Sequence, residues 1–317
     1  MNMQTYVIQR LLLAVLTIFI VSTVVFFMMR VIPGDAAFIQ LQDAGHITAE
    51  QIQQVKKSMG LDDNVIVQYL NWYKNVFTGD FGISYVTREP VIDGLVKSIP
   101  VTLELVIFAW TLSMTIGISV GALSALKPNT IIDYVARFIA ILGLSVPQFV
   151  LATIVVLVLS FQFNWIPPIG YHPLFEEPWG NIQQYFIPAL LLGFSSAAGK
   201  MRLTRSALLE VVRQDYIRTA RAKGLSESSI LIRHALKNAL APVFTVAGAQ
   251  LAALIGGTVV IELIFTMPGV GTWTLQGINS RDYPVVQTSA IFLTSVLVFM
   301  NIFVDVSLKW LDPRIKY

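Results

Sequence analysis

The sequence predicts an all-α polytopic membrane protein with six transmembrane helices. Three observations lead to this prediction: 55% of the 317 residues are hydrophobic, only 13% are charged, and apolar runs of bilayer-spanning length recur along the chain. Soluble domains usually contain about 25% charged residues. A chain this apolar cannot bury its side chains in one aqueous core, so the bilayer must be the solvent for much of it.

The first apolar run, Leu11–Met29, is bracketed by Arg10 and Arg30. Its position would suit a signal peptide, but it is long for one and no small-residue cleavage site follows. We therefore expect a retained transmembrane helix. Five further runs approach or exceed the roughly 20 residues that a spanning helix needs, and they lie at about Val101–Leu126, Val135–Phe161, Tyr185–Leu203, Pro242–Thr266 and Val285–Leu308.

Three of these spans contain residues that affect the course of a helix. The pair Gly199–Lys200 interrupts the end of the fourth span. Pro147 lies inside the third span, where its missing N–H permits a bend, and we expect a fixed kink there. In the fifth span, Gly248, Gly256 and Gly257 are expected to let helices approach closely.

The distribution of Lys and Arg predicts the orientation. With the N-terminus in the cytoplasm, 15 of the 22 basic residues lie on the cytoplasmic side and the other 7 lie outside. The short loop Gln162–Gln184 has none, and the loop Met267–Pro284 has only Arg281. Because short positive loops stay inside, we expect a multi-pass protein of the cytoplasmic (inner) membrane with both termini in the cytoplasm. The net charge of +3 then reflects loops near anionic lipid, and we expect no nucleic-acid partner.

The chain is expected to divide into three parts. Residues 1–32 form the cytoplasmic N-terminus and the first span, residues 33–100 form a small helical extracytoplasmic domain, and residues 101–317 form a core with five spans. The elements expected within the middle part are a helix over Ala49–Met59 with a capping box from Thr48 and Gln51, a helix over Asn64–Phe77, a turn at Gly79–Gly82 and a third short helix over Glu89–Ile99.

Residues for catalysis or metal binding are scattered. The chain has no cysteine, which excludes disulfides and thiolate metal sites. His46, His172 and His234 are far apart and show no metal-ligand spacing. Gly193–Met201 has one residue too many between its glycines for a phosphate-binding loop, and it ends in Met instead of Ser or Thr. We therefore expect no catalytic, cofactor or metal site in this chain.

Four acidic residues lie in or near the apolar runs. Glu104 and Glu262 are close to the predicted outer ends of the second and fifth spans, and we expect interfacial or structural pairing for both. Asp133 and Asp305 are expected at the cytoplasmic interface. Acidic residues at mid-depth, which a proton-coupled transporter would need, do not cluster in this sequence.

The cytoplasmic segment of about residues 204–241, hereafter the basic segment, departs from the apolar pattern. Gly224 predicts the end of one helix, Ser226 the N-cap of a second, and Pro242 a break before the fifth span. The first helix is expected to present Val211, Val212, Tyr216, Ile217 and Ala220, and the second Ile232, Leu236, Ala239 and Leu240. From the residues alone, this hairpin lies equally well on lipid or against a partner protein.

The stretch TARAKGLSESSILIRHALKNALAPV (Thr219–Val243) closely resembles the cytoplasmic loop of permease subunits of binding-protein-dependent ABC importers. More narrowly, the chain resembles the B-type subunit of the dipeptide/oligopeptide/nickel permease family. The further motifs that carry this resemblance, in this order and spacing, are VIPGDAA (Val31–Ala37), GDFGISYVTREPV (Gly79–Val91), IPVTLEL (Ile99–Leu105), IELIFTMPGVG (Ile261–Gly271) and RDYPVVQ (Arg281–Gln287).

One part of the loop departs from the superfamily pattern of Glu-Ala-Ala, three residues and Gly. Arg218, Thr219 and Ala220 occupy the first three places ahead of Gly224, so only the last Ala and the Gly match. The peptide branch is similarly degenerate, which favours that branch. An acidic contact found in other importers is therefore not expected here.

The resemblance implies the type I ABC importer fold and a subunit that forms half of a pore for dipeptides or oligopeptides. It implies a second homologous permease subunit, two ABC ATPase subunits that bind ATP and Mg²⁺, an extracytoplasmic solute-binding protein and surrounding membrane lipid. The chain would then be a transport subunit and no enzyme. The coupling helix that docks on an ATPase is expected at Asp215, Tyr216, Thr219, Ala220, Arg221, Ala222, Lys223 and Gly224.

Other functions are weighed against this one. Nickel chelates, glutathione or oligosaccharides could replace peptides as the substrate within the same family. An ion-coupled secondary transporter would predict internal repeats and broken helices around mid-membrane sites, and a membrane enzyme would need convergent His, Asp or Ser groups. We find neither pattern in the sequence.

Overall fold

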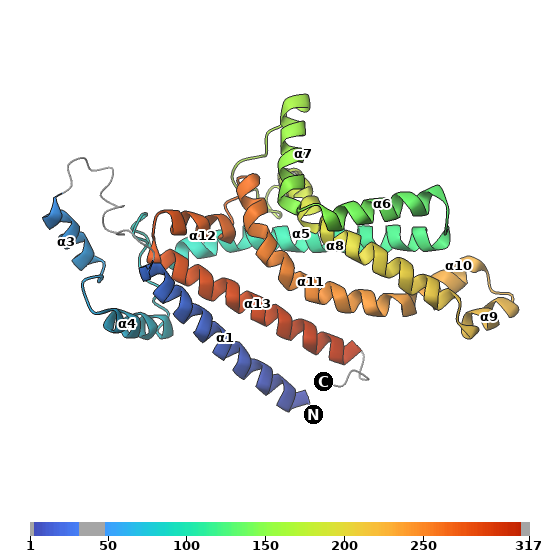
Figure 1. Ribbon diagram of the computed structural model, residues 1–317, viewed down its shortest axis with the longest axis horizontal. Helices are drawn as coiled ribbons and strands as arrows, with labels where there is room; N and C mark the ends of the chain where they lie inside the picture. The colour runs from blue at the N-terminus through green and yellow to red at the C-terminus, as the bar shows by residue number, and fades with distance from the viewer. Residues whose placement is uncertain (1–2, 32–47, 312–317) are drawn as a thin grey trace. The chain divides into compact units, whose positions relative to one another are not determined.

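The computed structural model describes residues 3–31 and 48–311, and most of these residues are helical. Apart from an isolated bridge between Ile83 and Pro90, this part of the chain has no β structure, so the all-α prediction is confirmed. The helices (Figure 1) are α1 Met3–Val31, α3 Ala49–Ser58, α4 Val65–Phe77, α5 Val91–Leu126, α6 Ile131–Ser145, α7 Gln148–Phe163, α8 Pro178–Val212, α9 Asp215–Ala222, α10 Glu227–Ser229, the π-helix η2 Ile230–Leu236, α11 Lys237–Ile264, α12 Val270–Asn279 and α13 Tyr283–Leu311. Most of the motif VIPGDAA, as well as His46 and the tail from residue 312, lie outside the described residues.

Several helices are long and apolar enough to cross a membrane. Within the described ranges these are Val7–Val31, Val91–Leu126, Glu227–Ile264 and Tyr283–Val304. The pair α6 and α7 meets the same criterion only as two segments bent by 107°, which would make a fifth span. The expected span Tyr185–Leu203 lies within α8, which is not among these helices.

The chain divides into two compact units. The first unit comprises Met1–Val101 and Pro268–Ile302, which hold α1, α3, α4, the start of α5, α12 and most of α13. The second unit comprises Thr102–Met267 and, among the described residues, 303–311 at the end of α13. The division expected at residues 33–100 remains a prediction.

In the first unit, aromatic packing fixes α4 along the end of α1. The ring of Phe26, which is fully buried, lies 5.1 Å from that of Tyr69 and 5.2 Å from that of Trp72, measured between centroids. Arg30 lies one turn further along α1, where its Nε and Nη2 donate to Gln68 Oε1 at 3.0 and 2.8 Å. Its guanidinium also lies 3.4 Å above the Phe26 ring, a cation–π contact.

The predicted capping signals around α3 are confirmed. Thr48 and Gln51 form the capping box ahead of α3, and Gly60 after the helix has a φ of +66°. Asn64 caps α4 by accepting a hydrogen bond from the Ile66 N–H. These features depend on neighbours only a few residues apart, which is why the sequence reveals them.

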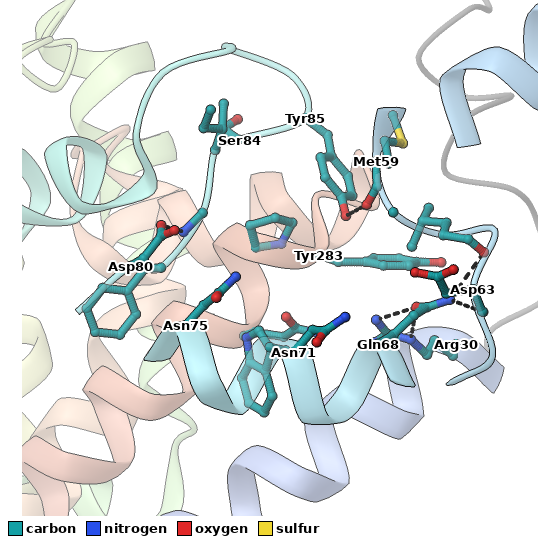
Figure 2. A pocket seen from close by; sticks show the side chains of 18 of the residues that line it. Arg30, Met59, Asp63, Gln68, Asn71, Asn75, Asp80, Ser84, Tyr85 and Tyr283 are labelled. Carbon is teal, nitrogen blue, oxygen red and sulfur yellow. Dashed lines mark hydrogen bonds between the residues drawn. The ribbon is translucent and has the colours of Figure 1, made fainter. Parts of the chain in front are cut away.

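The predicted turn at Gly79–Gly82 is also confirmed, because both glycines have positive φ angles, +82° and +84°. The loop that follows is held by Ser84, whose hydroxyl donates to the buried carboxylate of Asp282. α4, this loop and the first turns of α13 enclose a hollow of about 530 Å³, hereafter the α4 hollow (Figure 2).

The separate short helix expected at Glu89–Ile99 is wrong. α5 begins at Val91 and continues through Pro100 to Leu126. Proline removes one backbone hydrogen bond from a helix, but its fixed φ is helical. Burial of Leu95 and Val101 on either side holds the helix together across this position.

In the second unit, α8 packs against α6, α7 and α11. Glycines allow its backbone to approach that of α5. A Cβ atom at Gly121 would lie 2.5 Å from the carbonyl oxygen of Met201, and one at Gly193 would lie 2.5 Å from that of Ala109. Distances this short exclude any side chain without a movement of the helices.

Close approach at the glycines of α11 is confirmed for two of the three positions. A Cβ at Gly248 would lie 2.6 Å from Val304 Cγ1, and one at Gly257 would lie 2.9 Å from Gln148 Nε2. At Gly256 no described atom lies within 4 Å of the added Cβ.

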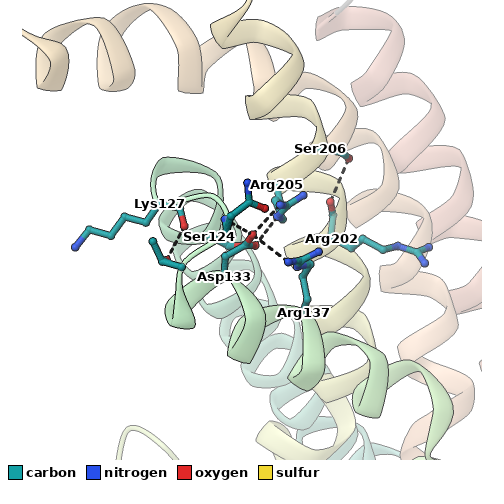
Figure 3. A network of polar contacts seen from close by, with 9 residues as sticks. Ser124, Lys127, Asp133, Arg137, Arg202, Arg205 and Ser206 are labelled. Atoms are coloured by element: carbon teal, nitrogen blue, oxygen red, sulfur yellow. Dashed lines mark hydrogen bonds and ion pairs between the residues drawn. The ribbon is translucent and has the colours of Figure 1, made fainter.

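A buried carboxylate joins α5, α6 and α8. Asp133 is fully buried and accepts hydrogen bonds from Ser124 Oγ at 2.6 Å and from the Asn129 N–H at 3.0 Å. Arg205 of α8 donates to both carboxylate oxygens, at 2.7 and 2.9 Å, and Arg137 Nη2 lies 3.4 Å away (Figure 3). Asp133 therefore lies inside a polar network between helices, and its expected place at the cytoplasmic interface remains a prediction. The side chain of Asp305 lies outside the described residues.

The third predicted span is broken and not merely kinked. Val146 has extended angles (φ −90°, ψ 123°), as expected for a residue ahead of a proline. α6 therefore ends at Ser145, and α7 starts at Gln148 at an angle of 107°. Because α6 and α7 both pack on α8, tertiary contacts stabilise the two separate directions.

We expect Gly121→Leu to destabilise the second unit by about 1–3 kcal/mol, because the added side chain would overlap the backbone of α8. Gly256→Leu is the matched control, since space is open at that glycine. Thermal unfolding of the purified chain in detergent measures both. Equal melting temperatures for the two variants would contradict the close approach of α5 and α8.

We expect Asp133→Asn to lower the free energy of unfolding by about 3 kcal/mol or more, because the substitution leaves the Arg205 guanidinium without its counter-ion. Asp215→Asn, in an exposed i,i+3 pair, should leave the melting temperature unchanged. In the same unfolding assay, the double variant Asp133→Asn, Arg205→Gln should lose less stability than the two single variants lose when their losses are added together. Additive losses would show that the two side chains do not interact.

Candidate functional site

The basic segment begins with a short helix that is amphipathic. α9 buries Ile217 completely and leaves Ala220 8% exposed, while its other side chains are exposed. α8 ends at Val212, and Gln214 precedes α9 in an extended conformation. The expected single helix that would include Val211 and Val212 is therefore wrong: those residues belong to α8.

The turn after α9 is closed by both backbone and side chains. Gly224 has a φ of +78°, and its N–H donates to the carbonyl of Arg221 at 2.9 Å, as predicted for a helix stop. Across the turn, Arg221 donates to both carboxylate oxygens of Glu227, at 2.7 and 3.2 Å. Ser226 occupies the N-cap position, but its side chain makes no capping hydrogen bond.

The second helix differs from the expectation in two ways. After α10 it passes through the π-helix η2 and then continues as α11, so the break expected at Pro242 is wrong. Ile232, expected on the buried stripe, is 67% exposed, whereas Ile230 and Ala235 are buried. The wider turn of a π-helix shifts the apolar face, and that shift could not be read from a period of 3.6 residues.

An apolar cluster fastens α9 to the rest of the second unit. Ile217 and Ala220 belong to a cluster of buried residues whose other members are Ala125 of α5, Leu208 of α8, Ile230 and Ala235 of η2, and Ala239 of α11. Asn238 of α11 also donates to the Tyr216 hydroxyl at 2.8 Å. α9 is therefore a helix held on one side and free on the other.

The predicted coupling residues lie together in space because they form α9 and its end. Within the set, only Ala220 is buried. The exposed members are Asp215, Tyr216, Thr219, Arg221, Ala222, Lys223 and Gly224. Their surface carries cations and one acid, and the Thr219 hydroxyl is turned back to the Asp215 carbonyl. Such a face can dock a protein by polar contacts but has no group poised for catalysis.

The α4 hollow is a second candidate site, within the first unit. Figure 2 shows Asn71 and Asn75 extending into it from α4, with Tyr85 and Tyr283 on the opposite side. Burial raises the pKa of Tyr85 to about 12, and its hydroxyl donates to the Met59 carbonyl at 3.4 Å. The lining combines apolar side chains with polar ones of both charges, which suits a small polar solute or a loop of another protein.

Glu104 and Glu262 have structural partners, as expected. Glu104 accepts hydrogen bonds from the Tyr171 hydroxyl at 2.8 Å and from Asn181 Nδ2 at 2.7 Å. Glu262 is fully buried and accepts one from Thr102 Oγ1 at 2.6 Å. Among the residues described, no cluster of His, Asp and Glu could hold a metal ion.

Two features of the second unit were missed by sequence reasoning. Lys200 does not interrupt α8 but is fully buried within it, where its Nζ donates to Ser113 at 3.0 Å. The Asp133–Arg205 pair joins residues 72 positions apart. Neither partner could be chosen from one sequence, although the charges inside apolar runs were a signal that partners must exist.

A family profile described as "Binding-protein-dependent transport system inner membrane component" matches residues 117–317. A profile for the N-terminal part of such membrane components matches residues 3–106. Together the two profiles include both the basic segment and the α4 hollow.

Named relatives match over the whole chain. A protein of Brucella abortus (strain 2308) named as a peptide transport system permease is 38% identical over 315 residues, covering 99% of this chain and 100% of the relative. The dipeptide transport system permease protein DppB of Alkalihalophilus pseudofirmus is 36% identical, with coverage of 99% and 100%. The glutathione transport system permease protein GsiC of Escherichia coli (strain K12) is also 36% identical, with the same coverage.

The fold is similar to that of a solved amino acid ABC transporter crystallised with histidines. The TM-score is 0.50 at 15% sequence identity, and the match covers 71% of this chain and 95% of the other. At this identity the similarity concerns the fold alone. The family is shown by the profile and the full-length relatives. The chain is a multi-pass membrane protein and a transport subunit, and it belongs to the permease family of binding-protein-dependent ABC importers.

Proposed function

We propose that this chain forms half of the translocation pore of an importer that takes up dipeptides or oligopeptides. The observation that carries the proposal is the match, over 99% of the chain, to relatives named for peptide and dipeptide transport. The relative named for glutathione, itself a small peptide, makes glutathione a second candidate substrate.

Two ATPase subunits, a second homologous permease and an extracytoplasmic solute-binding protein would complete the importer. ATP and Mg²⁺ would bind to the ATPases. In this assembly α9 would dock on an ATPase and transmit its movement to the pore. The exposed face of α9, its compact end at Gly224 and its attachment through Ile217 support this role.

We further propose six spans, made by α1, α5, α6 with α7, α8, α11 and α13, with both termini in the cytoplasm. The Lys and Arg counts on the two sides support this orientation, and it makes residues 33–100 an extracytoplasmic domain. α8 would be the fourth span. Its polar residues Lys200 and Thr204 have no solvent exposure, so a span at this place need not expose them to lipid.

Reconstitution with the partner subunits tests the function directly. We expect uptake of a labelled dipeptide into vesicles that requires both ATP and the solute-binding protein, with glutathione as the competing substrate. Uptake that persists without ATP and without the ATPases would contradict the importer assignment and favour an ion-coupled transporter.

Gly224→Val should uncouple ATP hydrolysis from uptake. A β-branched residue is strained at a φ of +78°, by about 1–2 kcal/mol, and would distort the end of α9. Uptake should fall at least about tenfold, while the ATPase activity of the assembled complex persists. Gly170→Val is the matched control, because Gly170 also has a positive φ (+95°) and open space but lies far from α9 in the chain. Normal transport by Gly224→Val would contradict the coupling role.

Single cysteines can test the orientation, since the natural sequence has none. Phe175, which is 95% exposed, lies in the predicted outer loop, and the exposed Ser228 lies in the basic segment. In spheroplasts an impermeant thiol reagent should label Phe175→Cys at once. It should label Ser228→Cys only after the membrane is permeabilised. The reverse pattern would mean that the chain has the opposite orientation in the membrane.

A further inference from the structure

A second hollow lies beside the Asp133 network, between α6 and α8. It has a volume of about 190 Å³ and is hereafter the α6–α8 hollow. Two kinds of side chain line it. The apolar ones are Ala136, Ala140, Ile141, Leu144 and Met201; the polar ones are Ser124, Arg137, Arg202, Arg205 and Ser206.

The charges at this hollow do not balance. Its three arginines face one acid, Asp133, and both oxygens of that carboxylate already accept hydrogen bonds from Arg205. Arg137 lies 3.4 Å from Asp133 and 4.6 Å above the centre of the Tyr134 ring, and its Nε is buried without a hydrogen-bond partner in the described part of the chain. The side chain of Arg202 points away from Asp133 in Figure 3. Two positive charges therefore remain for a ligand.

The apolar wall continues from the arginines along α6. Ile141 and Leu144 follow Arg137 by four and seven residues, which places them roughly 6 and 10 Å further along the helix axis. Ile141 is 62% exposed and Leu144 45% exposed. A ligand with an anionic end and a long apolar tail would contact the arginines and this wall together.

We propose that the α6–α8 hollow binds an anionic glycerophospholipid of the inner leaflet. Its phosphate lies between the guanidinium groups of Arg137 and Arg202, and an acyl chain lies along Ile141 and Leu144. The proposal rests on the topology given under Proposed function, which places the start of α6 and the end of α8 at the cytoplasmic boundary of the membrane. Basic pockets between spans at that boundary suit anionic headgroups.

The lipid chemistry fits better than two other occupants. A free anion would use the arginines but leave the apolar wall in water. A second permease subunit would need its own acid to meet Arg137 and Arg202, because a buried unpaired charge is costly. An anionic lipid satisfies the charges and covers the apolar wall at once.

Photocrosslinking in nanodiscs can test the site. The full chain is reconstituted, alone and with its partner subunits, in phosphatidylcholine that contains a small share of phosphatidylglycerol with a diazirine on its acyl chain. Mass spectrometry should locate crosslinks on α6 near Ile141 and Leu144. The same diazirine on phosphatidylcholine should label these positions at least about tenfold less.

The double variant Arg137→Gln, Arg202→Gln should reduce this labelling by about tenfold or more, because both headgroup contacts are lost. Arg137→Lys, Arg202→Lys should keep most of it, since the charges remain. The matched control is the double variant Arg213→Gln, Arg233→Gln, which removes the same amount of charge from exposed positions outside the hollow. It should be labelled to the same extent as the natural chain. Melting temperatures show whether each variant is folded.

Four results would overturn the proposal. The first is equal labelling by the two lipids, and the second is undiminished labelling of the folded double variant Arg137→Gln, Arg202→Gln. The third is displacement of the lipid by millimolar inorganic phosphate. The fourth is labelling of the chain alone that disappears in the assembled complex. The last result would mean that a protein subunit covers the hollow. ATP-dependent uptake by the same complex is measured separately, so a failure of the lipid site can be told apart from a failure of the importer assignment.

Discussion

A carboxylate that is removed from water must find its hydrogen bonds in the protein, or the fold loses stability. Asp133 meets this requirement with partners on three sides: Ser124 of α5, the backbone of Asn129 and Arg205 of α8. Because charge-assisted hydrogen bonds need a narrow geometry, this one group fixes the ends of three helices relative to one another. α8 runs only about two turns beyond Arg205 before α9 begins. The place of α9 therefore depends on Asp133.

The same arrangement makes α8 suited to carry movement. It is a single helix of 35 residues, and at Gly121 and Gly193 the backbones of α5 and α8 are nearly in contact. Close-packed interiors transmit displacement instead of absorbing it. In the proposed docking, a push on α9 would reach α8 through Leu208 and α11 through Ala239, because both residues share an apolar cluster with Ile217. Only Arg213 and Gln214 separate α8 from α9.

How much of this could be predicted depends on how far apart the interacting residues are. The capping box at Thr48 and the stop at Gly224 involve close neighbours in sequence, and both predictions are confirmed. Prolines behaved differently from one another. Pro147 separates two helices, whereas Pro100 and Pro242 lie inside continuous ones. A proline removes the same hydrogen bond in each case, so packing on distant helices decides whether the chain bends.

Polar groups within apolar helices show the same limit. Hydropathy counts a charged side chain against a membrane span whichever way it points, and α8 consequently falls short of the criterion that α5 and α11 meet. Yet Lys200 is fully buried against Ser113, a residue 87 positions away. Lipid would never touch that charge if α8 crossed the membrane inside the helix bundle. Whether α8 can be a span is therefore a question of burial by its neighbours, and composition alone gives a misleading answer.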